Sequence, residues 1–249
     1  MNILISGSSS GIGMGLAEYF ASKKHSICIT YLKSEKNAQD IYARLKEINP
    51  EGNHLLVQLD VLDAESVSKM ISLLGDKWTK VDLFISNAGV DYDINFEEMD
   101  INDWHSIFDT KIKGAFLTTK SLLPLMKQSD NGSIVYISAS VGWKPDWHDP
   151  AYSSASAAVN NFGQSMAIAL AKHKIRSNVV CPGPTMTNLK YWKQTESTNP
   201  QIWDNIKESN PLKRLCTPND IGSLIEYIAL EGLYINGNII YVNGGSHLR

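Results

Sequence analysis

The fold is decided near the start of the chain, by the stretch Asn2-Ile3-Leu4-Ile5-Ser6-Gly7-Ser8-Ser9-Ser10-Gly11-Ile12-Gly13. The apolar run from Ile3 to Ile5 predicts a buried strand, and the pattern from Met14 to Lys23 predicts a helix. Glycines between them let the backbone approach a ligand, and a helix N-terminus offers N–H groups to phosphate oxygens. The stretch therefore predicts a cradle for a diphosphate, although its GxxxGxG spacing differs from the usual GxGxxG. A glycine-rich turn without a ligand is the alternative.

Working outward, length and composition set limits on the class of protein. The chain has 249 residues and a net charge of −3, which predicts one domain, residues 1–249, with a full core. We find no basic stripe for nucleic acid and no apolar run long enough to cross a membrane. The N-terminus leads directly into a strand, so we expect no signal peptide and a cytoplasmic location. Three widely spaced cysteines predict reduced thiols, and the histidines show no metal-ligand spacing, so we expect no catalytic metal.

Apolar runs alternate with amphipathic helical patterns along the whole chain. This alternation predicts a Rossmann-like, doubly wound α/β domain, with a parallel sheet of about seven strands and helices on both faces. We expect the strands at Ile3–Ser6, Ser26–Thr30, Leu55–Leu59, Leu83–Ser86, Ser133–Ser138, Arg176–Cys181 and Ile239–Val242. We expect the helices at Gly13–Lys23, Glu35–Ile48, Ala64–Gly75, Ile101–Lys127, Tyr152–His173 and Pro218–Leu230.

One polar stretch, from Thr187 to Asn210, breaks this rhythm. It contains Tyr191, Trp192 and Trp203 and lies late in the chain. One interpretation is a substrate lid within the domain, residues 187–210. The other is a surface helical hairpin that its Trp residues only anchor.

The end of the second predicted strand bears on the choice of cofactor. In dinucleotide folds an acidic residue here binds the ribose hydroxyl of NAD, and basic groups accommodate the 2′-phosphate of NADP. Tyr31 stands at the acidic position, and Lys33 and Ser34 follow it. The pattern favours NADP, with NAD as the alternative and an ordinary solvated loop lysine as the other interpretation of Lys33.

Two further segments follow predicted strands, where open α/β sheets bind ligands. Asp60 and Val61 follow the third strand, where a carboxylate can accept the adenine amino group. Asn87, Ala88 and Gly89 follow the fourth, where small residues permit close contact with a ribose. Turn chemistry alone explains each segment singly, but their order and spacing indicate a cofactor crevice.

These segments resemble the short-chain dehydrogenase/reductase family along the whole chain. Ser6–Gly13 matches the family's TGxxxGIG, Ser86–Gly89 matches NNAG, and Pro182–Thr187 matches the PGxxxT segment that flanks the nicotinamide. The resemblance implies hydride transfer between a nicotinamide and a carbonyl or alcohol, and a homo-oligomer, a tetramer or dimer. The cofactor contacts that it implies are Gly7, Ser9, Ser10, Gly11, Ile12, Gly13, Tyr152, Pro182, Gly183, Thr185 and Thr187.

The catalytic positions depart from the family pattern. Family members use Asn, Ser, Tyr and Lys, with the last two in a YxxxK motif. Here Tyr152 matches, Ser156 replaces the lysine, Ala139 replaces the serine, and Lys111 replaces the asparagine. We expect Tyr152 to act as the acid at the substrate oxygen.

These replacements have chemical consequences. A phenol has a pKa of about 10, so without a nearby cation it stays neutral, able to donate a proton but a poor base. Loss of one oxyanion donor costs on the order of 10²–10³ in rate. A bulge can bring Ser140 back into register with the missing serine. Lys111 points toward the vacated lysine space, so we expect a relocated cation there; a surface lysine without a role is the alternative.

Three functions fit this sequence. The first is an NADPH-dependent reductase of a small-molecule carbonyl, with Tyr152 as acid and Lys111 as cation. The second is a cofactor-binding partner subunit or sensor without hydride transfer. The third is a dehydratase or isomerase that uses Tyr152 and His148. Likeness of fold does not choose among them.

The residues between the missing serine and Tyr152 are expected to border the substrate. We assign Ala139, Ser140, Trp143, Trp147 and His148 to the substrate pocket. Bulky aromatic walls favour a planar or acidic substrate, although Trp residues on such loops also fill hydrophobic space.

Overall fold

The computed structural model describes residues 1–90, 94–145, 149–188 and 200–248. Seven parallel strands form one sheet in the order β3-β2-β1-β4-β5-β6-β7. The predicted single doubly wound α/β domain is therefore confirmed. The strands are β1 (Asn2–Ile5), β2 (Ser26–Tyr31), β3 (Leu55–Gln58), β4 (Leu83–Ser86), β5 (Gly132–Ile137), β6 (Ile175–Pro182) and β7 (Ile239–Val242).

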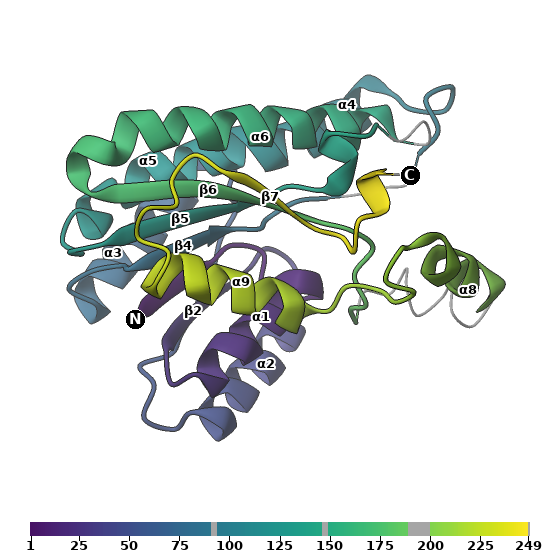
Figure 1. Cartoon of the computed structure of the whole chain (residues 1–249). Coiled ribbons are helices and arrows are strands. Elements are labelled where there is room, and N and C mark those ends of the chain that lie inside the picture. Colours follow the sequence, from purple (N-terminus) through teal and green to yellow (C-terminus); the bar gives the residue numbers. More distant parts are fainter. Residues whose placement is uncertain (91–93, 146–148, 189–199, 249) are drawn as a thin grey trace.

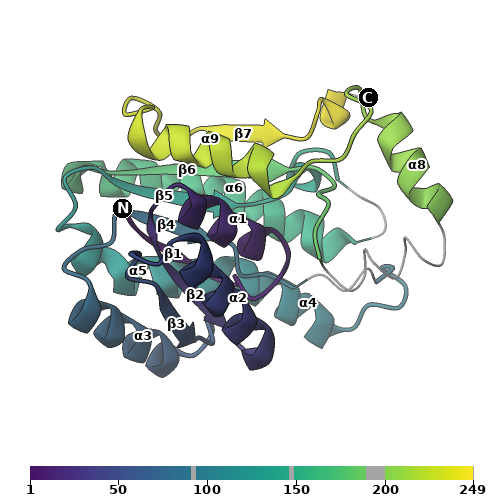
Figure 2. The ribbon, with the colours of Figure 1, turned by 90° about the horizontal axis from the view of Figure 1, so that it is seen from below.

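Helices cover both faces of this sheet, as Figure 1 shows. One face carries α3 (Ala64–Lys77), α4 (Ile101–Phe108), α5 (Gly114–Met126) and α6 (Pro150–Leu170). The other carries α1 (Gly11–Ser22), α2 (Glu35–Ile48) and α9 (Pro218–Leu230). Helix α8 (Pro200–Ser209) lies beyond the edge of the sheet (Figures 1 and 2). No helix among the described residues has the length and apolar character needed to span a membrane.

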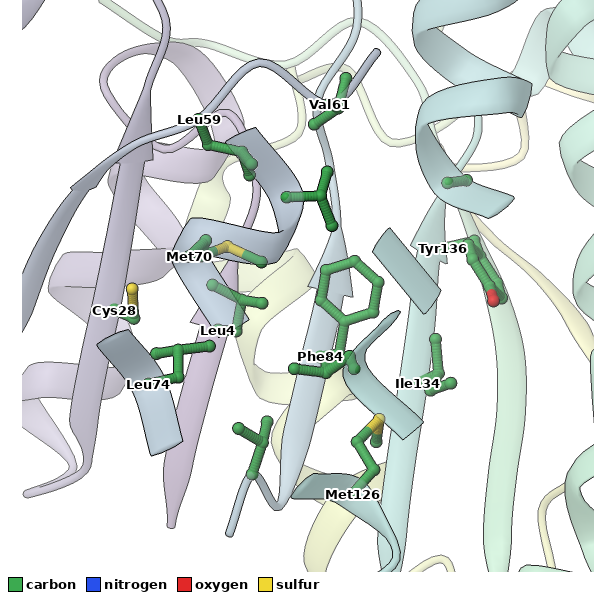
Figure 3. Packing of buried hydrophobic residues seen from close by; sticks show 14 of the residues in the cluster. Leu4, Cys28, Leu59, Val61, Met70, Leu74, Phe84, Met126, Ile134 and Tyr136 are labelled. Carbon is green, nitrogen blue, oxygen red and sulfur yellow. The ribbon is translucent and has the colours of Figure 1, made fainter. Parts of the chain in front are cut away.

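Alternating side chains of the strands divide the core into two layers. On β1, Leu4 faces the α3 and α5 side, whereas Ile3 and Ile5 face α1, and all three are fully buried. Figure 3 shows Leu4 and Phe84 in the first layer, with Met70 of α3 close by. Each such side chain stabilises the fold by about 1.5–3 kcal/mol. This packed core supports the loops at the edge of the sheet.

The helix predicted at Ile101–Lys127 is not one continuous α-helix. The backbone is helical from Ile101 to Met126, but Asp109–Lys113 forms a π-helical turn between α4 and α5. A π-turn contains an extra residue and shifts the faces on either side relative to one another. The apolar pattern of the flanking turns fits an ordinary α-helix, so the sequence did not indicate this break.

Helix α6 also starts earlier than the predicted Tyr152. Asp149 is its N-cap and accepts a hydrogen bond from the Tyr152 N–H at 2.8 Å, and Pro150 occupies the first turn. An Asp cap followed by Pro is a strong start signal, because Pro needs no N–H partner there. The helix becomes a 3₁₀ turn at Ala171–His173, before the sixth strand.

Half of the polar stretch 187–210 is described. It contains α8, and Trp203 of this helix is buried. Tyr191 and Trp192 lie outside the described residues. The buried Trp203 agrees with an anchoring role, and the substrate lid stays a prediction.

His54 joins β2 to the end of α2 through both ring nitrogens. Its Nδ1 accepts the Ile27 N–H at 3.2 Å, and its Nε2 donates to the Asn49 carbonyl at 3.1 Å. This arrangement requires a neutral ring. Burial lowers the pKa of His54 below its ordinary value, an effect that the Asn49 hydrogen bond partly opposes.

We expect the protein to lose stability as the pH falls from about 7 to 5, because the unfolded chain binds protons that His54 resists in the folded state. H54Q should unfold more easily at neutral pH, by on the order of 1–3 kcal/mol, and should show a smaller pH slope. Urea unfolding at several pH values measures both effects. Burial also lowers the pKa of His25, which keeps part of the slope. The exposed-site variant H105Q should behave as wild type; an unchanged slope in H54Q would contradict the assignment.

Candidate active site

The segments predicted to bind cofactor all follow the carboxyl ends of strands in one sheet. From β1 the chain runs outward through β2 to β3, and from β3 it crosses back to β4 on the other side of β1, so the strand order reverses between β1 and β4. Such a switch point opens a crevice at the carboxyl edge, where doubly wound sheets bind nucleotides. The structure thus brings together the predicted segments after β1, β2, β3, β4 and β6.

The glycine-rich loop after β1 packs against the loop after β4. A Cβ on Gly7, which has a φ of +64°, would lie 2.8 Å from the Ala88 Cα. The Asn87 Nδ2 donates to the carbonyl oxygens of Ser6 and Gly7, at 3.1 and 2.9 Å. A Cβ on Gly13 would lie 2.5 Å from that same Nδ2. Close packing, as well as ligand approach, therefore requires small residues in both loops.

The N-terminus of α1 presents a donor to an oxygen acceptor. The Gly11 N–H donates to the Oδ1 of Asn188 at 2.9 Å, and Ser10, the N-cap, forms no side-chain capping bond. The helix end thus donates an N–H to an oxygen acceptor, which is the kind of contact that a phosphate oxygen of a diphosphate would make. The predicted Ser9 and Ile12 lie beside it and are half-buried.

The loops after β2 and β3 lie farther along the same edge. Tyr31 ends β2 and is half-buried, while Lys33 and Ser34 are exposed. The Asp60 Oδ1 accepts the Leu62 N–H at 2.9 Å, which fixes the turn after β3. The predicted Val61 is buried, and its Cγ2 would lie 2.6 Å from a Cβ on Gly114 at the start of α5.

Lys111 lies in the π-turn and extends into the interior. Only 6% of the residue is exposed. Its Nζ donates to the Ser156 Oγ at 3.2 Å and lies 4.0 Å from the centroid of the Tyr152 ring. Its stem lies next to Gly89, whose added Cβ would be 3.6 Å from the Lys111 Cγ. The ammonium group therefore occupies the space beside Ser156.

The charge of Lys111 acts on a buried neighbour. Burial raises the pKa of the Cys181 thiol to about 11, while a hydrogen bond with Ser138 and the Lys111 charge act in the opposite direction. The thiol is protonated at neutral pH, so it does not neutralise the ammonium.

Tyr152 is placed by the cap of α6 and by a small apolar cluster. The Asp149 carboxylate fixes its backbone, and the ring packs with Ile107, Ala151 and Ala155, which are fully buried. The half-buried ring thus has apolar contacts and the Lys111 cation as neighbours.

The hydroxyl groups on either side of Ala139 form bonds elsewhere. The Ser138 Oγ donates to the Ser156 carbonyl at 2.9 Å. The Ser140 Oγ donates to the Pro182 carbonyl at 3.0 Å and accepts from the Asn243 Nδ2 at 2.9 Å. Ser140 therefore links the 3₁₀ turn after β5 to the end of β6, and its part at the substrate side stays a prediction.

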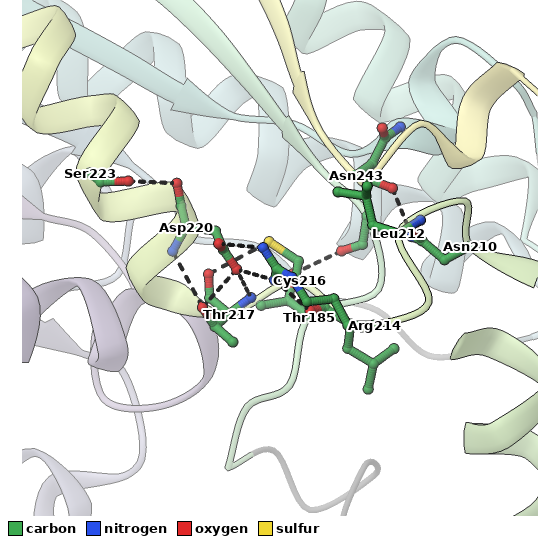
Figure 4. A network of polar contacts seen from close by, with 11 residues as sticks. Thr185, Asn210, Leu212, Arg214, Cys216, Thr217, Asp220, Ser223 and Asn243 are labelled. Atoms are coloured by element: carbon green, nitrogen blue, oxygen red, sulfur yellow. Dashed lines mark hydrogen bonds and ion pairs between the residues drawn. The ribbon is translucent and has the colours of Figure 1, made fainter. Parts of the chain in front are cut away.

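The PGxxxT segment is tied to the chain before α9. The Gly183 N–H donates to the Val242 carbonyl at 3.0 Å, and the Met186 N–H donates to the Cys216 carbonyl at 2.8 Å. The hydroxyl of buried Thr185 donates back to the Gly183 carbonyl at 2.8 Å. Figure 4 shows the surrounding network, in which Arg214 and Asp220 pair beside Thr217. Thr187 follows this anchored part.

The substrate side is described in part. Trp143 is 69% exposed, whereas Ala139 is buried. The predicted Trp147 and His148 lie outside the described residues. Within the part of the chain that the structure describes, no group of three or more His, Cys, Asp or Glu residues could hold a metal ion.

Sequence reasoning missed two residues of this site. Asn188 follows Thr187 directly, but no local pattern joins it to a helix 177 positions earlier. Asn243 directly follows β7, and its contact with Ser140 depends on the order of β6 and β7 in the sheet.

Comparison with known proteins gives matches over nearly the whole chain. A family model described as enoyl-(acyl carrier protein) reductase matches residues 7–247. A 3-oxoacyl-[acyl-carrier-protein] reductase from Synechocystis sp. is 30% identical over 244 residues, 97% of this chain and 95% of the relative. A reductase of the same name from Aquifex aeolicus is 30% identical over 245 residues, again 97% and 95%.

Solved structures agree with the fold described above. L-sorbose reductase from Gluconobacter frateurii, complexed with NADPH and L-sorbose, has a TM-score of 0.90 at 25% identity, covering 98% of this chain and 95% of that one. A short-chain dehydrogenase/reductase from Brucella melitensis has a TM-score of 0.88 at 25% identity, covering 98% and 96%. Sequence and fold together show that this chain belongs to the short-chain dehydrogenase/reductase family of oxidoreductases.

Proposed function

We propose that this protein is an NADP(H)-dependent reductase of a carbonyl group on a small molecule, with Tyr152 as the proton donor and Lys111 as the cation beside it. The observation that carries the proposal is the position of the Lys111 Nζ, 3.2 Å from the Ser156 Oγ and 4.0 Å from the Tyr152 ring centroid. A buried cation at the tyrosine remains although the lysine of the family motif is replaced.

The cofactor would lie along the carboxyl edge of the sheet. The diphosphate would rest on the N-terminus of α1, and its acceptor atoms would meet backbone N–H groups there. When bound, NADPH supplies the hydride. The residues that would hold it are Gly7, Ser9, Ser10, Gly11, Ile12, Gly13, Tyr31, Lys33, Ser34, Asp60, Val61, Asn87, Ala88, Gly89, Pro182, Gly183, Thr185 and Thr187.

Tyr152 would act as the general acid. As the substrate carbonyl is reduced, its oxygen gains negative charge, and the phenol donates its proton to that oxygen. The phenolate that remains is stabilised by the positive charge of Lys111, a residue that is itself buried. The ammonium lies over the ring face, where the attraction of a cation for the π-electrons also holds the ring in place.

Ala139 limits the rate of this chemistry. It supplies no hydrogen bond to the developing oxyanion, and the hydroxyls of Ser138 and Ser140 are bonded to backbone carbonyls. The oxyanion then depends on Tyr152 alone among these groups.

The relatives support carbonyl reduction. The two relatives at 30% identity are named as 3-oxoacyl reductases, and the solved neighbour at 25% reduces sorbose by its name. Exposed Trp143 lies in the loop that we assign to the substrate side. Trp147, His148, the lid 187–210 and the homo-oligomer are parts of this proposal that rest on the sequence.

We expect K111M to lower the kcat of carbonyl reduction at least about tenfold, because the phenolate loses its cation, and Y152F to lower it by about 10²-fold or more. Methionine retains most of the volume of the lysine stem, so K111M should fold. NADPH oxidation over a panel of ketones and aldehydes measures the rates, and NADPH fluorescence measures binding. K113M, which removes an exposed lysine of the same π-turn, is the matched control.

Other results would point elsewhere. If K111M reduces carbonyls at the wild-type rate, Lys111 has no catalytic part. If the wild type binds NADPH but reduces no carbonyl, the partner-subunit or sensor function replaces this one. A product whose oxidation state equals that of its substrate would favour a dehydratase or isomerase.

A substitution at Lys33 tests the preference for NADPH over NADH. A charged hydrogen bond is worth about 1.5–3 kcal/mol, so K33E should weaken NADPH binding about tenfold or more and leave NADH binding nearly unchanged. K77E makes the same change of charge at the exposed far end of α3 and should have no effect. Equal weakening for both cofactors in K33E would show that Lys33 does not contact the 2′-phosphate.

A further inference from the structure

We propose that Asn188 is a competitor for the diphosphate site: its side-chain oxygen takes the hydrogen bond that the cofactor requires, so cofactor binding displaces it. This inference rests on the proposed function, which assigns the N-terminus of α1 to the diphosphate. It adds a residue and a coupling that the family motifs do not indicate.

The contact itself is specific. The Gly11 N–H donates to the Asn188 Oδ1 at 2.9 Å, and the Asn188 Nδ2 lies 3.2 Å from the Sδ of Met14, in the first turn of α1. Ser10 at the N-cap provides no side-chain acceptor to this helix. The first N–H groups of a helix have no partner within the helix. The distant Asn188 therefore supplies the acceptor that the neighbouring residues do not.

Two acceptors then compete for one hydrogen. The amide oxygen of Asn188 is neutral, whereas a diphosphate oxygen is charged and also gains from the helix dipole. The diphosphate therefore displaces the Asn188 oxygen, but its free energy of binding is weaker by the free energy of the Asn188 hydrogen bond. A ligand that must replace an existing contact binds more weakly by that amount.

Asn188 lies directly after a backbone segment that is held in place. The backbone just before it is fixed, because the Met186 N–H donates to the Cys216 carbonyl and Thr185 pairs with Cys216. The exchangeable bond is therefore at the end of the segment that flanks the nicotinamide. Diphosphate binding and the conformation at residue 188 are linked, and linkage acts equally in both directions.

The test compares N188A and N188D with wild type. N188A removes the competitor, so we expect the Kd of NADPH to fall about two- to tenfold, the range for one ordinary hydrogen bond. N188D places a carboxylate at the helix end, where it should hold the Gly11 N–H more firmly and repel the diphosphate, raising the Kd about tenfold. N131A, which changes an exposed asparagine in the turn before β5, is the matched control.

Three further probes make the result specific. Inorganic pyrophosphate should follow the same order as NADPH, and 2′-AMP, which lacks a diphosphate, should bind all variants equally. The Gly11 amide should exchange its hydrogen faster in N188A than in wild type, as seen by NMR without any ligand.

The outcomes separate this inference from the proposed function. If wild type binds NADPH but N188A binds it no more tightly, or more weakly, Asn188 is not a competitor while the reductase proposal stands. An unchanged Gly11 exchange rate in N188A would also overturn it. If wild type binds neither NADPH nor pyrophosphate, both proposals fail, because there is then no ligand for Asn188 to oppose.

Discussion

The ammonium group of Lys111 lies 3.2 Å from the Ser156 hydroxyl and 4.0 Å from the centre of the Tyr152 ring, in a residue that is only 6% exposed. Taking a charge out of water is costly unless nearby groups compensate. Here a hydroxyl acceptor and an aromatic face supply part of that compensation, and the Cys181 thiol stays neutral. A buried charge kept at such a cost beside a half-buried phenol favours a chemical role over a structural one.

The fold makes this contact from three separated parts of the chain. The π-turn between α4 and α5 carries Lys111, the loop after β4 lies next to its stem at Gly89, and α6 presents Tyr152 and Ser156. Parallel strands bring these parts to one edge of the sheet. We propose that the Lys111 cation takes the part of the lysine of the family motif, so that the YxxxK motif can be lost without a change of fold.

The sequence predicted the sheet well, because buried parallel strands are nearly continuous apolar runs and all seven of them stood out. Lys111 was identified from its position, but its contact with Ser156 depends on tertiary packing that no local pattern encodes. The π-turn could not be predicted, since its flanks have ordinary helical periodicity. The start of α6 could have been, from Asp149 and Pro150. Contacts across the sheet edge, such as Asn188 with Gly11, depend on the finished topology.

The most direct test of the relocated cation exchanges the two positions. K111N, S156K and the double variant K111N/S156K are compared in one assay of NADPH-linked carbonyl reduction, with NADPH binding and thermal unfolding as checks on folding. If the site requires one cation beside Tyr152, the double variant should exceed K111N by about tenfold or more, a difference of about 1.4 kcal/mol in the activation free energy. A folded double variant no more active than K111N, or a K111N enzyme as active as wild type, would contradict the account.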